Sequence, residues 1–192
     1  MYGKQKIKCW KTYGHGTLGM SESIQRSCNP YFMKLANQLG TEKVVEVMEL
    51  LGMGQITGIR LPHESPGMVP GSIAWQREYR NERMTPAFTG MTAIGQGYAE
   101  ASPLQLAGLV SAIANGGRYY KPRIIKEVKH PEHGTMIQDR ATLQRDLLAE
   151  GVSPEALATI KKGMWMAANK IGGTGRKASL DDIEVAVKTG TA

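Results

Sequence analysis

Residues 102–117 constrain the fold of this chain more than any other stretch. The segment opens with Ser102-Pro103, a typical helix start, because serine accepts backbone hydrogen bonds at the N-cap and proline suits the first helical position. Asn115-Gly116-Gly117 then ends the helix. Apolar residues recur on one of its faces, namely Leu106, Leu109, Val110 and Ile113. Because most of the other residues are small, we expect neighbours to pack close and the helix to lie buried at the centre of the fold.

Helical signals recur on both sides of this segment. Asn29, followed by Pro30, is predicted to cap one helix, and Thr41 is predicted to cap the next. Glycine and proline are frequent in residues 52–100, where we expect a long connection with short extended pieces. The other helices are predicted over residues 20–26, 30–39, 42–51 and 154–169, with an extended segment over 118–129 and a flexible loop over 172–175.

Composition places the chain among globular proteins. Its 192 residues suffice for one domain with a hydrophobic core, and 41% of them are hydrophobic. No run approaches the ~18 apolar residues of a membrane span, and the basic N-terminus lacks the apolar segment of a signal peptide. The net charge is +7, but the cations are spread and no aromatic-interleaved basic motif is present. We therefore expect no nucleic-acid partner.

The cysteines and histidines do not predict a metal site. Cys9 and Cys28 lack a metal-binding spacing such as C-x-x-C, and we expect two isolated buried thiols, with a disulfide between them as the alternative. The His130-Pro131-Glu132-His133 stretch is polar and has no third ligand in view, so surface histidines are expected there. No metal and no cofactor are expected for the chain.

The C-terminal residues 184–192 combine a strand pattern with polar residues. Ile183, Val185 and Val187 fall on one face of an alternating segment. The stretch ends in Lys188-Thr189-Gly190-Thr191, which sets a cation and two hydroxyls beside a glycine backbone against which a ligand can lie. Taken alone, this pattern is typical of an ordinary edge strand with a polar end.

A second candidate segment, Ser27-Cys28-Asn29, changes the weight of the first. Its serine and asparagine project from one turn before a proline-started helix, whose N-terminus favours negative charge nearby. Simple helix capping is the alternative for this motif alone. However, an S-x-N turn followed far downstream by K-T-G on a strand makes two thirds of the signature of penicillin-recognising enzymes.

With both motifs in place, the chain resembles the transpeptidase domain of class B penicillin-binding proteins, in the elongation-specific branch of the penicillin-binding protein 2 type. The resemblance follows the family's order over nearly the whole chain. Val187 is a departure, because relatives often have glycine before the lysine. The further stretches that carry the resemblance are Cys9-Trp10, Gly14-His15-Gly16, residues 57–64, Ile94-Gly95-Gln96-Gly97-Tyr98, Ser102-Pro103-Leu104-Gln105-Leu106-Ala107 and Ala114-Asn115-Gly116-Gly117.

The resemblance implies an α+β fold of the penicillin-binding protein transpeptidase and serine β-lactamase-like type. Of that fold, residues 1–192 would form a partial transpeptidase domain, mostly the helical subdomain plus the strand carrying Lys-Thr-Gly. The family's nucleophile motif, S-x-x-K, is absent, because none of the nine serines has a lysine three residues later. We expect that motif before residue 1 and further strands and a helix after residue 192, so the isolated chain should be inactive and its terminal strand poorly held.

The implied activity is peptidoglycan D,D-transpeptidation in cell-wall elongation. A nucleophilic serine attacks the penultimate D-Ala carbonyl of a stem peptide, D-Ala leaves, and the acyl group passes to an amine of a neighbouring stem. By resemblance, three residues would be catalytic. Ser27 would relay protons, Asn29 would hydrogen-bond the amide of the bound peptide, and Lys188 would keep the hydroxyl network poised and attract the substrate carboxylate.

Three further residues would bind the substrate. The hydroxyls of Thr189 and Thr191 would bind its carboxylate, the N–H of Thr191 would donate to the oxyanion, and Gly190 would let its backbone approach the strand. The implied partners are stem peptides with D-Ala-D-Ala ends, β-lactams and the membrane glycosyltransferase of the elongation machinery. The implied location is the periplasmic face of the bacterial inner membrane, with the anchor outside this chain.

Two alternatives remain beside the transpeptidase. A non-catalytic penicillin- or peptidoglycan-binding or sensor module of the same fold would lack the nucleophile motif altogether. A β-lactamase would need a group that activates water for deacylation, and no residue of this chain suggests itself for that role. The sequence upstream of Met1 separates the first alternative from the enzyme.

Overall fold

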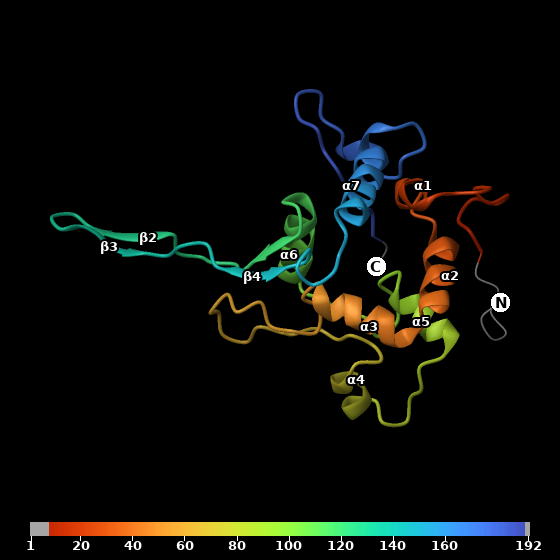
Figure 1. Ribbon diagram of the computed structural model, residues 1–192, viewed down its shortest axis with the longest axis horizontal. Helices are drawn as coiled ribbons and strands as arrows, with labels where there is room; N and C mark the ends of the chain where they lie inside the picture. Colours follow the sequence, from red (N-terminus) through yellow and green to blue (C-terminus); the bar gives the residue numbers. More distant parts are fainter. Residues whose placement is uncertain (1–7, 191–192) are drawn as a thin grey trace.

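The computed structural model describes residues 8–190, which form a body of packed helices and two small antiparallel sheets (Figure 1). Helix α7 packs along α1, α2 packs against α3 and α5, and α6 packs against β1. Within the described residues, no helix is both long and apolar enough to cross a membrane. The elements are α1 (Met20–Gln25), α2 (Asn29–Leu39), α3 (Thr41–Leu50), α4 (Ile73–Glu78), α5 (Pro86–Thr92), α6 (Pro103–Ala114), β1 (Arg118–Tyr120), β2 (Glu127–His130), β3 (Gly134–Gln138), β4 (Leu143–Asp146), α7 (Pro154–Asn169) and the 3₁₀-helix η1 (Arg176–Ala178).

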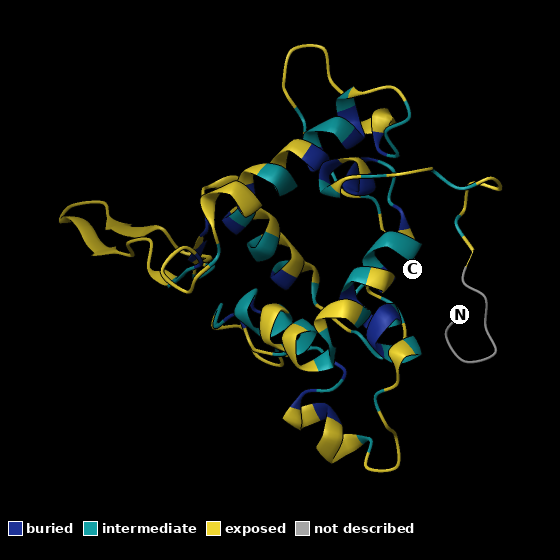
Figure 2. Ribbon diagram, turned by 45° about the vertical axis from the view of Figure 1, so that its right-hand side comes forward, coloured by how far each residue is buried: buried dark blue, intermediate teal, exposed yellow. Residues whose placement is uncertain are grey.

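Strand β1 pairs with β4, and β2 pairs with β3. The β2–β3 hairpin projects far from the helices (Figure 1), and every residue of both strands is exposed (Figure 2). The extended segment predicted over residues 118–129 is thus confirmed in part, since two short strands fall within it. Both sheets contain only two strands, so sheet pairing contributes little of the core in the described part of the chain.

Helix α6 begins as predicted but buries a different face. The Ser102 hydroxyl accepts from the Gln105 N–H (3.2 Å), and the Gln105 side chain accepts from the Ser102 N–H (2.7 Å), which makes a capping box. The predicted apolar face is buried only in part, because Leu109 and Ile113 are half-buried whereas Leu106 and Val110 are 49% and 46% exposed. The buried residues are Gln105 and Ala112.

Tertiary contacts explain this rotation of α6. The Gln105 amide donates to the backbone oxygens of Gly52, Gln55 and Pro66, so a polar side chain fixes the loop after α3 to the helix. Tyr119 of β1 fills the space beside Gly108, where a Cβ would lie 2.6 Å from the tyrosine oxygen. The core around Ala112, Tyr119 and Leu147 therefore packs on the face of α6 that carries Gly108 and Ala112, and not on the face that carries Leu106 and Val110.

The starts of α2 and α3 also differ from the prediction. Cys28, not Asn29, is the N-cap of α2, and Asn29 is its first residue. Thr41 likewise begins α3 without capping it, because its hydroxyl lies 2.6 Å from the Thr89 hydroxyl of α5. Gly40 joins the two helices with φ +87°, a conformation that glycine adopts without strain.

The long connection over residues 52–100 contains two short helices that the sequence did not predict. Ser72 caps α4 by accepting from the Trp75 N–H, and Thr85 caps α5 by accepting from the Phe88 N–H. The expected extended pieces are reduced to a single bridge between Met68 and Glu100. Helices of six and seven residues are too short to show a clear helical period.

The predicted C-terminal strand is extended chain that pairs with no strand among the described residues. Residues 184–190 instead lie against α7, where the Val187 N–H donates to the Met164 carbonyl (3.0 Å) and the Asn169 amide donates to the Val185 carbonyl (2.8 Å). The predicted alternation persists over residues 184–188, because Val185 and Val187 are half-buried while their neighbours are exposed. It does not extend to Ile183, which was predicted on the same face and is 64% exposed. The pattern was right, and its partner is a helix rather than a sheet.

Candidate functional site

The S-x-N segment is the turn that joins α1 to α2. Ser27 has φ +48°, an uncommon conformation for a residue other than glycine, and backbone bonds hold it on both sides. The Ser27 N–H donates to the Ile24 carbonyl (3.1 Å), and the Cys28 N–H donates to the Ser23 carbonyl (3.0 Å). In this turn the Ser27 side chain is half-buried, and its hydroxyl makes no hydrogen bond to the backbone of α1 or α2.

Lys188 meets that hydroxyl from the other end of the sequence. Its Nζ donates to Ser27 Oγ at 3.0 Å and to its neighbour's carbonyl, Thr189 O, at 2.6 Å. Desolvation lowers the pKa of Lys188 below the ordinary lysine value of 10.5, although part of the side chain stays open to solvent. The two motifs that sequence analysis paired are therefore in direct contact across 161 positions.

The loop over residues 171–175 connects the two motifs a second time. The Thr174 N–H and hydroxyl both donate to the Gln25 carbonyl (3.1 and 3.3 Å), and the same hydroxyl lies 3.0 Å from the Thr189 hydroxyl. Gln25 also donates to the Ile171 carbonyl (3.1 Å), so the loop is tied to the end of α1. The sequence predicted a flexible loop here and did not single out Thr174, and no local signal in Gly173-Thr174-Gly175 shows what that threonine contacts.

Gly175 accounts for the valine that departs from the family pattern. A Cβ on Gly175 would collide with Val187 Cγ2, so the absence of a side chain there leaves room for Val187. Val187 is half-buried beside α7, whereas Lys188 next to it is exposed toward Ser27. The valine side chain thus points away from the lysine, as the alternation of the segment predicts.

The remaining predicted site residues are placed less tightly. Asn29 is exposed at the start of α2 and makes no side-chain hydrogen bond within residues 8–190. Gly190 is exposed, with open space where a side chain would stand. Thr191 lies outside the described residues. The structure therefore brings Ser27, Lys188 and Thr189 together and leaves Asn29 free to bind a ligand.

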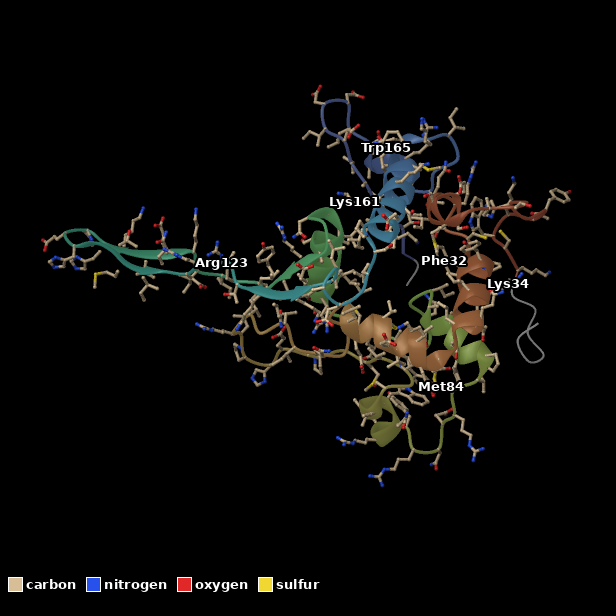
Figure 3. The ribbon with its side chains drawn as sticks, in the orientation of Figure 1. Phe32, Lys34, Met84, Arg123, Lys161 and Trp165 are labelled. Carbon is tan, nitrogen blue, oxygen red and sulfur yellow. The ribbon has the colours of Figure 1, made fainter. Side chains whose placement is uncertain are left out.

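A cavity borders the same face of the C-terminal segment. It measures about 530 Å³ and lies between α6 and α7, with Glu184 and Ala186 at its edge. These two residues alternate in phase with Lys188. Lys161 and Trp165 of α7 form its opposite wall, where Figure 3 shows them. Space for a ligand or a further segment is thus available beside Glu184 and Ala186.

The segment before α1 is hydrogen-bonded to the residue that precedes the S-x-N turn. Trp10 donates through its indole N–H to the Arg26 carbonyl (2.9 Å), and Arg26 donates to the Gly172 carbonyl (3.0 Å). Cys9, His15 and Cys28 are gathered at this point, and Cys9 Sγ lies 3.0 Å from His15 Nδ1. The two thiols are therefore neighbours rather than isolated, and they form no disulfide.

Two groups of side chains are arranged so that they could hold a metal ion. The Cys9, His15 and Cys28 ligand atoms lie within 4.8 Å of one another, and thiolate and imidazole are ligands that zinc accepts. Burial, followed by the charges of two nearby cations, lowers the pKa of His15, which favours the neutral imidazole. The second group, His130, Glu132 and His133, is fully exposed at the hairpin tip.

Comparison with known proteins places this geometry in a family. A family model described as the penicillin binding protein transpeptidase domain matches residues 1–192. The chain is 34% identical over 187 residues to stage V sporulation protein D of Bacillus subtilis and 32% identical over 187 residues to peptidoglycan D,D-transpeptidase MrdA of Acinetobacter baumannii. Each match covers 97% of this chain but 27% of the relative, so the chain spans about a quarter of the length of these curated proteins.

Solved structures agree with the sequence relatives. A penicillin-binding protein (PBP2) from Helicobacter pylori superposes with a TM-score of 0.81 at 28% identity, covering 99% of this chain and 34% of that one. The same protein in complex with MreC gives a TM-score of 0.80 at 28% identity, covering 100% and 34%. The expected fold class is confirmed, and the chain belongs to the penicillin-binding protein transpeptidase domain family.

Proposed function

We propose that this chain is part of a peptidoglycan D,D-transpeptidase, an enzyme that cross-links stem peptides through an acyl-serine intermediate. The observation that carries the proposal is the hydrogen bond from Lys188 to Ser27. A lysine and a serine from opposite ends of the sequence are held at 3.0 Å, and a serine hydroxyl oriented in this way can relay a proton to a bound substrate. The names of the curated transpeptidase relatives support the same activity.

In this proposal each part of the site has a distinct task. Ser27 receives and returns the proton that travels between the nucleophile and the leaving D-Ala amine. Lys188 stays protonated, orients the Ser27 hydroxyl and attracts the carboxylate of the stem peptide. The Thr189 hydroxyl, oriented by Thr174, binds that carboxylate, and Asn29 binds the peptide amide.

Two further assignments complete the substrate site. Gly190 lets the substrate backbone approach the extended segment, and Thr191 supplies both a hydroxyl and the oxyanion N–H. An oxyanion donor of this kind contributes about 3–4 kcal/mol to the transition state. The nucleophile itself comes from an S-x-x-K motif that precedes residue 1 in the complete protein, with residues 1–192 as part of the transpeptidase domain.

Acylation of the complete protein by a fluorescent penicillin tests the proposal. We expect covalent labelling of the complete protein and none of the 192-residue chain alone. Ser27→Ala and Lys188→Ala should each slow labelling by about 100-fold, the usual size of a proton-transfer contribution. Lys177→Ala, which removes an exposed cation of η1, is the matched control and should change the rate less than about twofold.

A non-catalytic binding module of the same fold is the second candidate. The observation that favours it is the absence of S-x-x-K among the 192 residues. The same experiment separates the two, because a binding module would hold a penicillin reversibly and yield no covalent adduct by mass spectrometry. Covalent labelling of the 192-residue chain itself would contradict both candidates.

We further propose that the complete protein works in cell elongation on the periplasmic face of the bacterial inner membrane, beside a membrane glycosyltransferase. Two solved relatives support a role within an assembly, because one is a complex of PBP2 with MreC and the other belongs to a peptidoglycan synthase complex. Stem peptides with D-Ala-D-Ala ends are the proposed substrates and β-lactams the proposed inhibitors. Affinity capture of the complete protein from cross-linked cells, with and without a Lys188→Ala change, tests the partner independently of catalysis.

A further inference from the structure

A second cavity lies at the base of the β2–β3 hairpin, and its lining shares no residue with the Ser27 and Lys188 site. The hairpin itself projects from the body of the protein (Figure 1). The cavity measures about 390 Å³, within the usual range for a small-ligand site. Four basic side chains line it, and Asp139 is the only acidic residue among the lining positions. The basic residues are Arg60, Lys121, Arg123 and Arg140. Figure 3 shows Arg123 where the hairpin leaves the body of the protein.

These cations are not neutralised by the described part of the protein. The ion pairs of residues 8–190 involve other lysines, and none includes a residue of this cavity. Arg123 donates to the Asp139 backbone carbonyl rather than to its carboxylate. Arg60, Lys121 and Arg140 make no side-chain hydrogen bond within residues 8–190. By contrast, the neighbouring Arg145 is used structurally, because it donates to the Glu49 and Leu50 carbonyls at the end of α3.

The walls of the cavity are held in place before any ligand binds. Glu64 accepts from the Thr57 N–H (2.6 Å) and the Gly58 N–H (3.1 Å), which closes the loop that carries Arg60. Arg60 itself has φ +64°, a conformation that persists in a non-glycine residue only when its surroundings impose it. Gly58 also makes room for Lys121, whose Cε would lie 3.0 Å from a Cβ at that position.

The hairpin base supplies the opposite wall in an equally fixed form. The Lys121 N–H donates to the Thr142 carbonyl (3.0 Å), and the Asp139 N–H donates to the Lys126 carbonyl (2.9 Å). These bonds extend the antiparallel ladder beyond the named strands and set the spacing between residues 121–126 and 139–142. Like charges are therefore kept near one another by backbone geometry, and a bound anion would relieve their repulsion.

We propose that this cavity is a binding site for a phosphate-bearing ligand. Each of the three guanidinium groups can bind two oxygens of a phosphate at once, and the lysine ammonium adds a further positive charge. The lining carries four positive charges against one negative charge, which leaves a net charge of +3. One carboxylate offsets a third of that charge, and one phosphate, at about −1.5 to −2, offsets half or more of it. A pyrophosphate, or several headgroups at a lipid surface, offsets most of it. The proposal is independent of the transpeptidase site, which uses other residues.

The phosphate group belongs either to a free pyrophosphate or to the headgroup of an anionic lipid, and titration of the complete protein distinguishes the two sources. One arm adds sodium pyrophosphate and the other adds phosphatidylglycerol vesicles, each at about 50 mM salt, where charge screening is weak. We expect saturable one-to-one binding in at least one arm. Binding in the first arm alone assigns a soluble phosphate, and binding in the second alone assigns a headgroup.

Paired variants of equal charge separate a local site from general attraction to a basic protein. The Arg60→Gln/Arg140→Gln double variant should weaken binding at least about tenfold, because each lost guanidinium removes a charge-assisted bond. Arg80→Gln/Arg83→Gln, two exposed arginines near α4, loses the same charge and should change binding less than about twofold. Circular dichroism and thermal melting confirm that both variants fold.

Three outcomes would overturn the proposal. The first is that neither phosphate source binds to the folded complete protein. Equal weakening in both double variants is the second, since it would reflect net charge alone. The third is binding of a tetraglutamate peptide in preference to both phosphate sources, which would assign the cavity to an acidic protein segment instead.

Discussion

Replacing Thr174 by valine removes one hydroxyl and keeps the size of the side chain. The Thr174 N–H would keep its bond to the Gln25 carbonyl (3.1 Å), so the loop over residues 171–175 should stay attached to α1. The contacts of the Thr174 hydroxyl with the Gln25 carbonyl (3.3 Å) and with the Thr189 hydroxyl (3.0 Å) would both be lost. A hydrogen bond between half-buried neutral groups contributes about 1 kcal/mol net, which corresponds to roughly a fivefold change in a rate that depends on it.

Acylation by a fluorescent penicillin measures this effect in the complete protein. We expect Thr174→Val to lower the second-order rate constant about fivefold, because the Thr189 hydroxyl loses the partner that orients it. Thr174→Ser keeps the hydroxyl and should stay within about twofold of the unmodified protein. Thr142→Val, which removes an exposed hydroxyl at the hairpin base, is the matched control and should leave the rate unchanged.

A double-mutant cycle decides whether Thr174 acts through Thr189. If it does, Thr174→Val should have little further effect once Thr189→Val has been introduced, and the coupling energy should be about 1 kcal/mol. A coupling energy near zero would refute the reasoning, even if both single variants were slow. An unchanged rate in Thr174→Val alone would refute it as well, because the loop bond to Gln25 would then suffice.

Three further predictions test the scaffold and the electrostatics. Gln105→Leu should lower the free energy of unfolding by about 3 kcal/mol in urea denaturation, because it leaves three backbone carbonyls without their hydrogen-bond donor. Gln38→Leu on the exposed side of α2 is the control and should change the free energy of unfolding little. Hydrogen bonds, first from the Thr57 hydroxyl, lower the pKa of Glu64, so the stabilisation by its carboxylate is present above pH 4.5 and lost as the pH falls through the lowered pKa. Glu64→Gln should therefore reduce the acid-induced loss of folding free energy by about 1 kcal/mol after solvent screening. A pH profile of stability that Glu64→Gln leaves unchanged would contradict this. Because desolvation lowers the pKa of Lys188, acylation should decline on the alkaline side below pH 10.5, and a decline that Lys188→Arg does not move to higher pH would exclude Lys188 as its cause.

Local chemistry explains what the sequence predicted well. Ser102 and Ser153 cap α6 and α7 through bonds to residues three positions ahead, so the signal and the structure lie within one turn. The alternation of residues 184–190 likewise survives, because it depends only on extended backbone. The pairing of Ser27 with Lys188 was also predicted, but through the resemblance to a family rather than through local chemistry.

Features that depend on distant partners were not predictable in the same way. Tyr119 and the loop after α3 determine which face of α6 is buried. The helical period therefore predicted that a helix forms, but not which of its faces lies in the core. Thr174 sits among glycines and shows its role only when Gln25 and Thr189 are placed beside it. Cys9 and Cys28 share no short spacing and meet only because the segment before α1 folds back onto the turn.

The packing of α1 on α7 is the step that turns two sequence motifs into one site. Ser21 on α1 donates to the Thr159 carbonyl of α7 (2.9 Å), and Gly163 of α7 lets Ile24 approach so closely that a Cβ would lie 2.7 Å from the isoleucine Cβ. Helix α1 runs directly into Ser27, and α7 runs through the 171–175 loop into the segment that carries Lys188. Because both motifs leave from the same helix pair, their separation is set by the helix contact and not by the long chain between them. A site built in this way tolerates change in the intervening hairpin and loops, while a single added methyl group at Gly163 would move Ser27 and Lys188 apart together with their helices.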